Sequence, residues 1–268
     1  MAKSSRGGKR TSATAGGGGT IAATQGGSPA TQQVQIDDTQ QAQPMSANYD
    51  SFMAMTDDQK ADTIDAMANQ PAPAFLSDTA MQRFTYNLGL NDKPTLVDDS
   101  VLDTMNGTEL FRTVNSGKDP VARVKYDADE IATQIQRGRV TRYSDNGGSV
   151  YGRGLYFADD YRGSKVYGNT TGNIKSTAMV RAKLNSNAKT IDYYKARAGL
   201  GAEINSGSKL GKALRKVQRT DSESAVSIYA LSKGYNVITS GHGYFNVLNR
   251  NAVTMSKTIK ATNSNNRW

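Results

Sequence analysis

Apolar residues are almost absent from the first forty-odd positions of the chain, and they recur with helix and strand periodicities from about residue 47 onward. Residues 1–46 consist mainly of Gly, Ser, Thr, Ala and Gln, and they include the glycine run 16–19. Such a segment cannot bury enough apolar surface to offset the entropy lost on ordering it. We therefore expect residues 1–46 to form a disordered tail.

Two amphipathic helices are expected in residues 47–95, as a small helical segment ahead of the main domain. The first begins where Thr56 and Gln59 have the spacing of a capping box, and it ends before the first of two nearby prolines. The second is capped by Ser77, carries its apolar residues on one face and ends at Gly89.

Residues 96–268 alternate between short apolar strands and amphipathic helices. The expected strands cover residues 109–114, 155–158, 178–184, 236–239, 244–248 and 252–256. The expected helices begin at Asp127 and Thr220, and residues 193–218 are expected to be helical in pieces broken at Gly199, Gly201 and Gly207. Strands near both ends of this region, with helices between them, favour an α+β domain over a regular parallel βαβ array.

Composition and charge exclude several classes of site. The chain has no cysteine and one histidine, which rules out disulfides, cysteine-ligated zinc and histidine-rich metal centres, so we expect no metal. No run of about 18 apolar residues is present, so we expect no membrane span. The net charge of +9, partly in the tail and partly in residues 209–219, indicates either a solvated basic surface or contact with nucleic acid. No aromatic residues alternate with these cations, as stacking on single strands would need.

The most distinctive motif is the glycine-rich segment 147–154, which leads directly into the apolar strand 155–158. Glycines allow a backbone to approach a ligand where a Cβ atom would clash. The order of glycines and then strand is the reverse of that in the Rossmann dinucleotide fingerprint. Downstream, Ser164 and Tyr167 follow with a Ser-x-x-Tyr spacing.

Together these residues resemble the ADP-ribosyltransferase fold. Gly154-Leu155-Tyr156-Phe157-Ala158 with its Ser-x-x-Tyr resembles the poly-ADP-ribose-polymerase type, and Leu110-Phe111-Arg112-Thr113-Val114 resembles the first strand of arginine-type members. The resemblance covers about residues 108–258 and is closest to ADP-ribosyltransferase-like domains of phage structural proteins. It implies a split β-sheet core with flanking helices, NAD as substrate, and a location in a virion or host cytoplasm.

The resemblance also implies which residues bind NAD. Arg112 would anchor the diphosphate and ribose, Tyr156 and Tyr167 would enclose the nicotinamide ring, and Ser164 would hold its amide. The implied NAD-binding set is Arg112, Gly154, Tyr156, Phe157, Ser164 and Tyr167. The alternative is that Arg112 is a surface residue at a strand end and that the tyrosines are half-buried core residues.

The implied catalytic positions are Arg112, Tyr156 and Tyr244, and the last of these departs from the family pattern. Tyr244 stands where the resemblance places a glutamate, and no acidic residue follows Glu223. A tyrosine provides no negative charge for an oxocarbenium-like transition state, so we expect NAD binding with slow turnover. Glu223 or Asp221 could supply an acid from the preceding helix, although helix capping explains both more simply. His242 is expected in an exposed loop; as a site residue it could contact a diphosphate or replace the missing acid.

We therefore expect a mono-ADP-ribosyltransferase-like protein that binds NAD and transfers ADP-ribose to a side chain of a protein acceptor. The alternative is a catalytically degenerate virion component or NAD-binding protein on the same fold. A third interpretation, based on the net charge, is a nucleic-acid-associated structural protein. The expected partners are NAD, an acceptor or virion proteins, and nucleic acid contacted nonspecifically through the basic tail.

Overall fold

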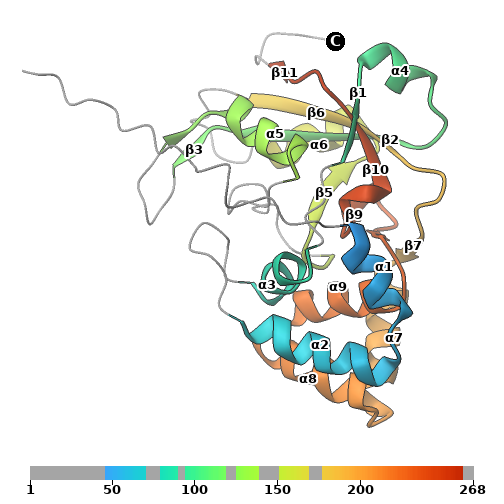
Figure 1. The fold of residues 1–268 in the computed structure, drawn as a ribbon. Coiled ribbons are helices and arrows are strands. Elements are labelled where there is room, and N and C mark those ends of the chain that lie inside the picture. Colours follow the sequence, from blue (N-terminus) through green and yellow to red (C-terminus); the bar gives the residue numbers. More distant parts are fainter. Residues whose placement is uncertain are drawn as a thin grey trace, which may run out of the picture. The chain divides into compact units, whose positions relative to one another are not determined.

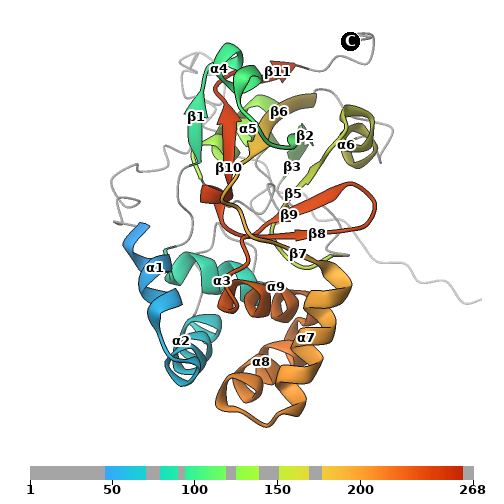
Figure 2. The same cartoon turned by 90° about the vertical axis from the view of Figure 1, so that its right-hand side faces the viewer.

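The computed structural model describes residues 46–70, 79–89, 94–118, 125–138, 151–168 and 177–261. These residues form a mixed α+β fold, in which helices flank a large mixed sheet (Figures 1 and 2). The expected disordered tail lies outside the described residues.

The sheet brings together strands from both ends of the described chain. Its strands are β1 (Thr95–Val97), β2 (Glu109–Asn115), β5 (Leu155–Ala158), β6 (Thr177–Leu184), β7 (Thr190–Asp192), β8 (Val237–Thr239), β9 (Tyr244–Val247), β10 (Val253–Ser256) and β11 (Lys260–Ala261). Their order is β1-β10-β6-β2-β5-β9-β8-β7, with β11 pairing with β6. The β1–β10 and β7–β8 pairs are parallel, and the other pairs are antiparallel. The short strands β3 (Gly117–Lys118) and β4 (Lys125–Tyr126) pair with each other in a separate two-stranded sheet.

The sheet is weakly joined near its middle. β2 pairs with β6 at seven positions, and β5 pairs with β9 at four. Between these two well-paired halves, β2 and β5 share one register pair, Phe111 with Ala158. The halves therefore meet at a junction where β2 and β5 are paired at a single register position.

The helices pack around this sheet in two hydrophobic cores. They are α1 (Ser46–Ala54), α2 (Asp57–Asn69), α3 (Ala80–Asn87), α4 (Asp99–Thr104), α5 (Ala128–Gln136), α6 (Tyr161–Gly168), α7 (Tyr193–Asn205), α8 (Lys209–Thr220) and α9 (Ser222–Ser232), with a 3₁₀ turn at Arg250–Ala252. In the first core, α1, α2 and α3 pack with α7, α8 and α9; in the second, α5 packs against the sheet.

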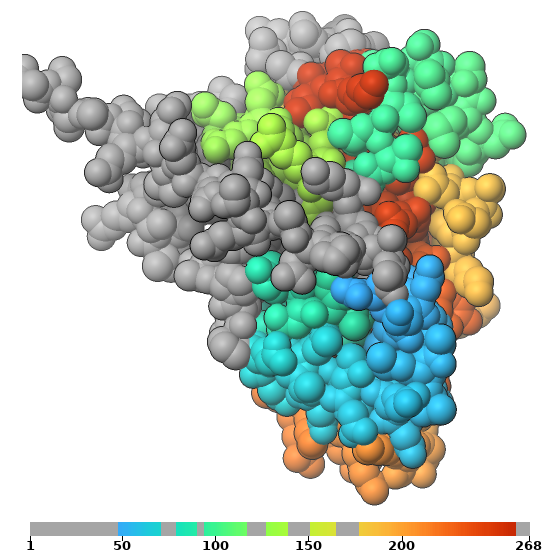
Figure 3. Space-filling view, in the orientation of Figure 1, coloured from blue at the N-terminus to red at the C-terminus, as the bar shows by residue number. Residues whose placement is uncertain are grey.

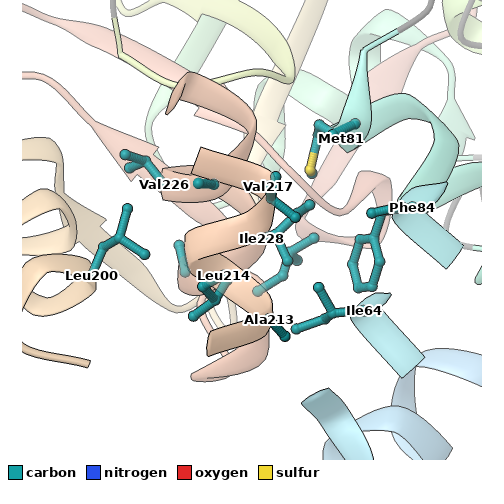
Figure 4. Packing of buried hydrophobic residues seen from close by; sticks show 14 of the residues in the cluster. Ile64, Met81, Phe84, Leu200, Ala213, Leu214, Val217, Val226 and Ile228 are labelled. Carbon is teal, nitrogen blue, oxygen red and sulfur yellow. The ribbon is translucent and has the colours of Figure 1, made fainter. Parts of the chain in front are cut away.

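The first core is shared between segments far apart in sequence. Ile64 of α2 and Phe84 of α3 lie close to Val217 of α8 and Ile228 of α9 (Figure 4). In the space-filling view, α1, α2 and α3 cover one side of this half of the molecule, with α8 below them (Figure 3). The N-terminal helices therefore pack into the same compact unit, residues 43–268, as the sheet.

Most of the expected elements are confirmed, and four details of the helices need correction. The Thr56–Gln59 capping box is present. α3 is capped by Thr79 and begins at Ala80, while Ser77 lies outside the described residues. Three further corrections follow. Asp127 precedes α5 but makes no side-chain capping bond. α7 runs unbroken through Gly199 and Gly201, and α9 is capped by Asp221 and not by Thr220.

Much of the basic run in α8 is engaged within the fold. Lys209 pairs with Asp62 at 2.6 Å and Lys216 pairs with Asp65 at 2.5 Å, so α8 faces acidic residues of α2. Arg215 donates to the carbonyl of Ile204 at 2.8 Å. These contacts leave fewer cations of this helix for a polyanion than the sequence count suggests.

Candidate functional site

The site predicted from sequence falls at the junction between β2 and β5. Arg112 lies in the middle of β2, where buried and half-buried positions alternate, and it is 8% exposed. Its Nη1 atom donates a hydrogen bond to the backbone carbonyl of Tyr156 in β5 at 2.7 Å. The guanidinium thus connects β2 with β5 next to Phe111 and Ala158, the register pair of these two strands. The structure therefore places Arg112 and Tyr156 in direct contact, through the guanidinium and a carbonyl and not through the tyrosine ring.

The hydroxyl of Tyr156 turns back onto the glycine-rich segment that precedes its own strand. It accepts from the N–H of Tyr151 at 3.0 Å and donates to the carbonyl of Gly152. Asn246 of β9 donates to the carbonyl of Tyr151 at 3.0 Å. Residues 151–154 are therefore held as a tight turn against β5 and β9.

The first turns of α9 hold the other side of this glycine turn. The N–H of Gly152 donates to Oε2 of Glu223 at 2.9 Å, and the N–H of Arg153 donates to Oγ of Ser227 at 2.8 Å. The Arg153 guanidinium also lies 3.6 Å from the carboxylate of Asp221. Three successive backbone N–H groups, at residues 151–153, thus donate to side chains of the protein itself.

Two glycines of this turn are explained by contacts within the fold. Gly152 has a φ of +91°, which favours glycine, and a Cβ there would lie 2.6 Å from Oγ of Ser227. A Cβ at Gly154 would overlap the amide oxygen of Asn246 and lie 2.9 Å from the carbonyl of Val247. The glycines therefore allow the turn to pack closely against α9 and β9.

Tyr244 belongs to a cluster of aromatic rings beside this turn. Its ring stacks on that of Tyr151, with centroids 6.4 Å apart and planes inclined by 20°. Tyr151 in turn meets the ring of Tyr193 edge-on, with centroids 5.4 Å apart. The hydroxyl of Tyr193 lies 3.4 Å from both carboxylate oxygens of Glu223. Burial, and then the charge of Glu223, raise the pKa of Tyr193, so its phenol stays protonated and donates to that carboxylate.

Strand alternation shows which of these side chains share a face. Ala158 pairs with Tyr244 and Tyr156 pairs with Asn246, so these four side chains lie on the same face of the β5–β9 pair. The register pair with Phe111 puts Thr113 on that face too, and Arg112 on the opposite one. Tyr156 and Tyr244 thus share a face, and Arg112 reaches their strand from the other side.

The remaining NAD-binding candidates are divided between this face and the core. Ser164 of α6 is 3% exposed; its Oγ is 3.0 Å from that of Thr113, so it lies next to the face that carries Tyr156. Phe157 is 2% exposed and packs in the second hydrophobic core, which makes it a core residue. Tyr167 lies in α6, but its side chain is outside the described part of the structure. His242 is exposed in the loop between β8 and β9, as expected.

The structure adds residues that the motifs did not indicate. Tyr193, Ser227 and Asn246 contact the turn or its aromatic ring at Tyr151. From the sequence, Glu223 is one possible source of an acid, and helix capping is its simpler explanation. The structure assigns the capping bond to Asp221, which accepts from the N–H of Ser224 at 3.1 Å, whereas Glu223 points to the glycine turn. The only sequence signal for Glu223 is that no carboxylate follows it.

Comparison of the chain with protein-family models, curated proteins and solved structures gave no match. Among the described residues, no three His, Asp or Glu side chains are grouped so as to hold a metal ion. No helix in the described ranges has the length and apolar character needed to cross a membrane.

Proposed function

We propose that the protein binds NAD at the junction of β2, β5 and β9 and acts as a mono-ADP-ribosyltransferase-like protein. The observation that supports this most is the contact of Arg112 with Tyr156 where the two halves of the sheet meet. These two residues come from the two motifs that resemble the family, and they are 44 residues apart in sequence. Tyr244, the position where the resemblance places a glutamate, lies on the adjoining strand β9.

In this proposal the face of β5 and β9 that carries Tyr156 and Tyr244 receives the nicotinamide half of NAD. Aromatic side chains there can stack on the planar ring, and Ser164 lies beside the same face. Arg112 lies on the opposite face, where it holds β5 against β2 and so fixes the position of the strand that carries Tyr156. The acceptor would be a side chain of another protein, in a virion or in a host cell, as the resemblance to phage domains suggests.

A second candidate is a virion component or NAD-binding protein on the same scaffold that does not turn NAD over. Three observations favour it. The N–H groups of residues 151–153 already donate within the protein, and the buried Arg112 donates to a backbone carbonyl. Tyr244 also provides no negative charge of its own. These features are compatible with NAD binding, so the rate at which NAD is turned over is the measurement that separates the two candidates.

Isothermal titration of the full chain with NAD tests the proposal. We expect binding in the micromolar to millimolar range for NAD and much weaker binding for ATP, which shares the adenosine and phosphates but lacks nicotinamide. Incubation with labelled NAD and an acceptor-rich lysate then separates the two candidates, because only the enzyme transfers the label. No binding of NAD at millimolar concentration would contradict the enzyme and the NAD-binding protein, and would leave only a structural virion role.

A further inference from the structure

Glu223 is the acidic side chain that the structure brings to the candidate site. It is the last acidic side chain in the sequence, and it lies in the first turn of α9. Because Asp221 caps that helix, capping does not account for Glu223. Its carboxylate instead accepts from Gly152 and lies within 3.4 Å of the Tyr193 hydroxyl.

The surroundings of Glu223 connect it with the position that lacks an acid. Tyr193 meets Tyr151 edge-on, and Tyr151 stacks on Tyr244. The Glu223 carboxylate and the Tyr244 ring therefore flank the same pair of tyrosines, next to the glycine turn that holds the Tyr156 hydroxyl. The carboxylate is half-buried beside aromatic rings, where the effective dielectric is lower than in water. Its electrostatic interaction with a nearby positive charge is therefore stronger than it would be in solvent.

We propose that Glu223 is the acidic residue of this site and that it replaces, from α9, the carboxylate missing at Tyr244. This inference rests on the proposed function. In the reaction, the C–N bond between ribose and nicotinamide breaks, and its electron pair leaves with nicotinamide. A C–O bond forms to water or to an acceptor oxygen, whose proton passes to solvent. The carboxylate of Glu223 stabilises the positive charge that develops on the ribose as the C–N bond breaks.

The test uses the full chain and the substitution Glu223→Gln. Glutamine keeps an oxygen that can accept from Gly152, so the turn is retained while the charge is removed. We expect the dissociation constant for NAD to change by less than about threefold, and nicotinamide release to fall by about 100- to 1,000-fold, the range found when one preorganised group is removed. Glu130→Gln is the matched control, because Glu130 is an exposed acid in the first turn of α5, and it should leave both quantities unchanged.

A second variant separates the carboxylate from the support it gives to the turn. Ser227→Ala removes the other hydrogen bond from α9 to residues 151–153 and keeps the charge, so release should fall by no more than about tenfold. A loss as large as that of Glu223→Gln would mean that the turn matters and not the charge, and would overturn the proposal. So would a Glu223→Gln rate within threefold of the wild type, or a wild-type protein that binds NAD and releases no nicotinamide. Failure to bind NAD would instead overturn the proposed function itself.

Discussion

At the scale of single residues, two glycines of α7 stand in opposite environments although they are two positions apart. A Cβ at Gly199 would lie 2.8 Å from Cζ and 2.9 Å from Cε1 of Tyr229, so α7 approaches α9 closely there. At Gly201 nothing lies within 4 Å of the same atom. Gly199 is therefore required by packing, and Gly201 carries only the entropic cost of a glycine inside a helix.

This difference predicts opposite effects of one substitution. Gly201→Ala should raise the free energy of unfolding by about 0.5–1 kcal/mol, because alanine loses less backbone entropy in a helix. Gly199→Ala has the same entropic benefit, but it forces the Tyr229 ring to move, and such overpacking costs about 1–3 kcal/mol. This substitution should therefore be destabilising. Urea unfolding of the two variants measures both values. Equal stabilisation by the two alanines would show that the α7–α9 approach is looser than described.

At the scale of elements, α9 connects the first core to the candidate site. Most of its residues are buried, and its first two turns contact the glycine turn through Asp221, Glu223 and Ser227. The start of this helix therefore sets the position of the turn, and Asp221 fixes that start by accepting from the N–H and the hydroxyl of Ser224, at 3.1 and 2.6 Å.

Removing this cap should destabilise the protein measurably. Asp221→Ala is expected to lower the free energy of unfolding by about 1 kcal/mol, the typical cost of losing an N-cap side chain. Asp127→Ala is the matched control, because Asp127 also precedes a helix but makes no side-chain capping bond; its effect should stay within about 0.5 kcal/mol. Chemical denaturation of both variants gives the comparison. A loss for Asp127 as large as that for Asp221 would assign the effect to charge near a helix start and not to the capping bond.

Elements with local signals were predictable from sequence, and contacts between distant side chains were not. The Thr56 capping box and the alternating strand at 109–114 depend on neighbours within a few residues, and both are present. Short elements such as β1 and α4 carry too few residues for a periodicity. The contacts of Glu223 with Gly152 and Tyr193 span 71 and 30 residues, and no spacing rule indicates them. The motif resemblance places Arg112 and Tyr156 around one ligand, whereas the described contact runs from the Arg112 guanidinium to the Tyr156 carbonyl, with the two side chains on opposite faces of the sheet.

At the scale of the whole molecule, the described chain from α1 to β11 folds around two cores, and the N-terminal helices belong to the first. Phe52, Ile64 and Phe84 are fully buried there, together with residues of α8 and α9. The ion pairs between α2 and α8 lie on the surface of the same contact. Exposed pairs of this kind contribute little, so the apolar contact holds α1–α3 in place.

The last prediction separates the tail from these helices. Deletion of residues 1–45 should lower the melting temperature by less than about 3 °C, because this segment has almost no apolar residues to bury. For a protein of this size, about 1 kcal/mol of stability corresponds to a shift of 2–4 °C.

The control is deletion of residues 1–92, which also removes Phe52, Ile64 and Phe84 from the first core. Losing one such side chain typically costs about 2–5 kcal/mol, so the second deletion should abolish cooperative unfolding. Thermal scans followed by far-ultraviolet circular dichroism give both results. A drop of more than about 5 °C for the shorter deletion would show that the tail makes stabilising contacts with the fold, and a cooperative transition after the longer one would show that the sheet folds without its N-terminal helices.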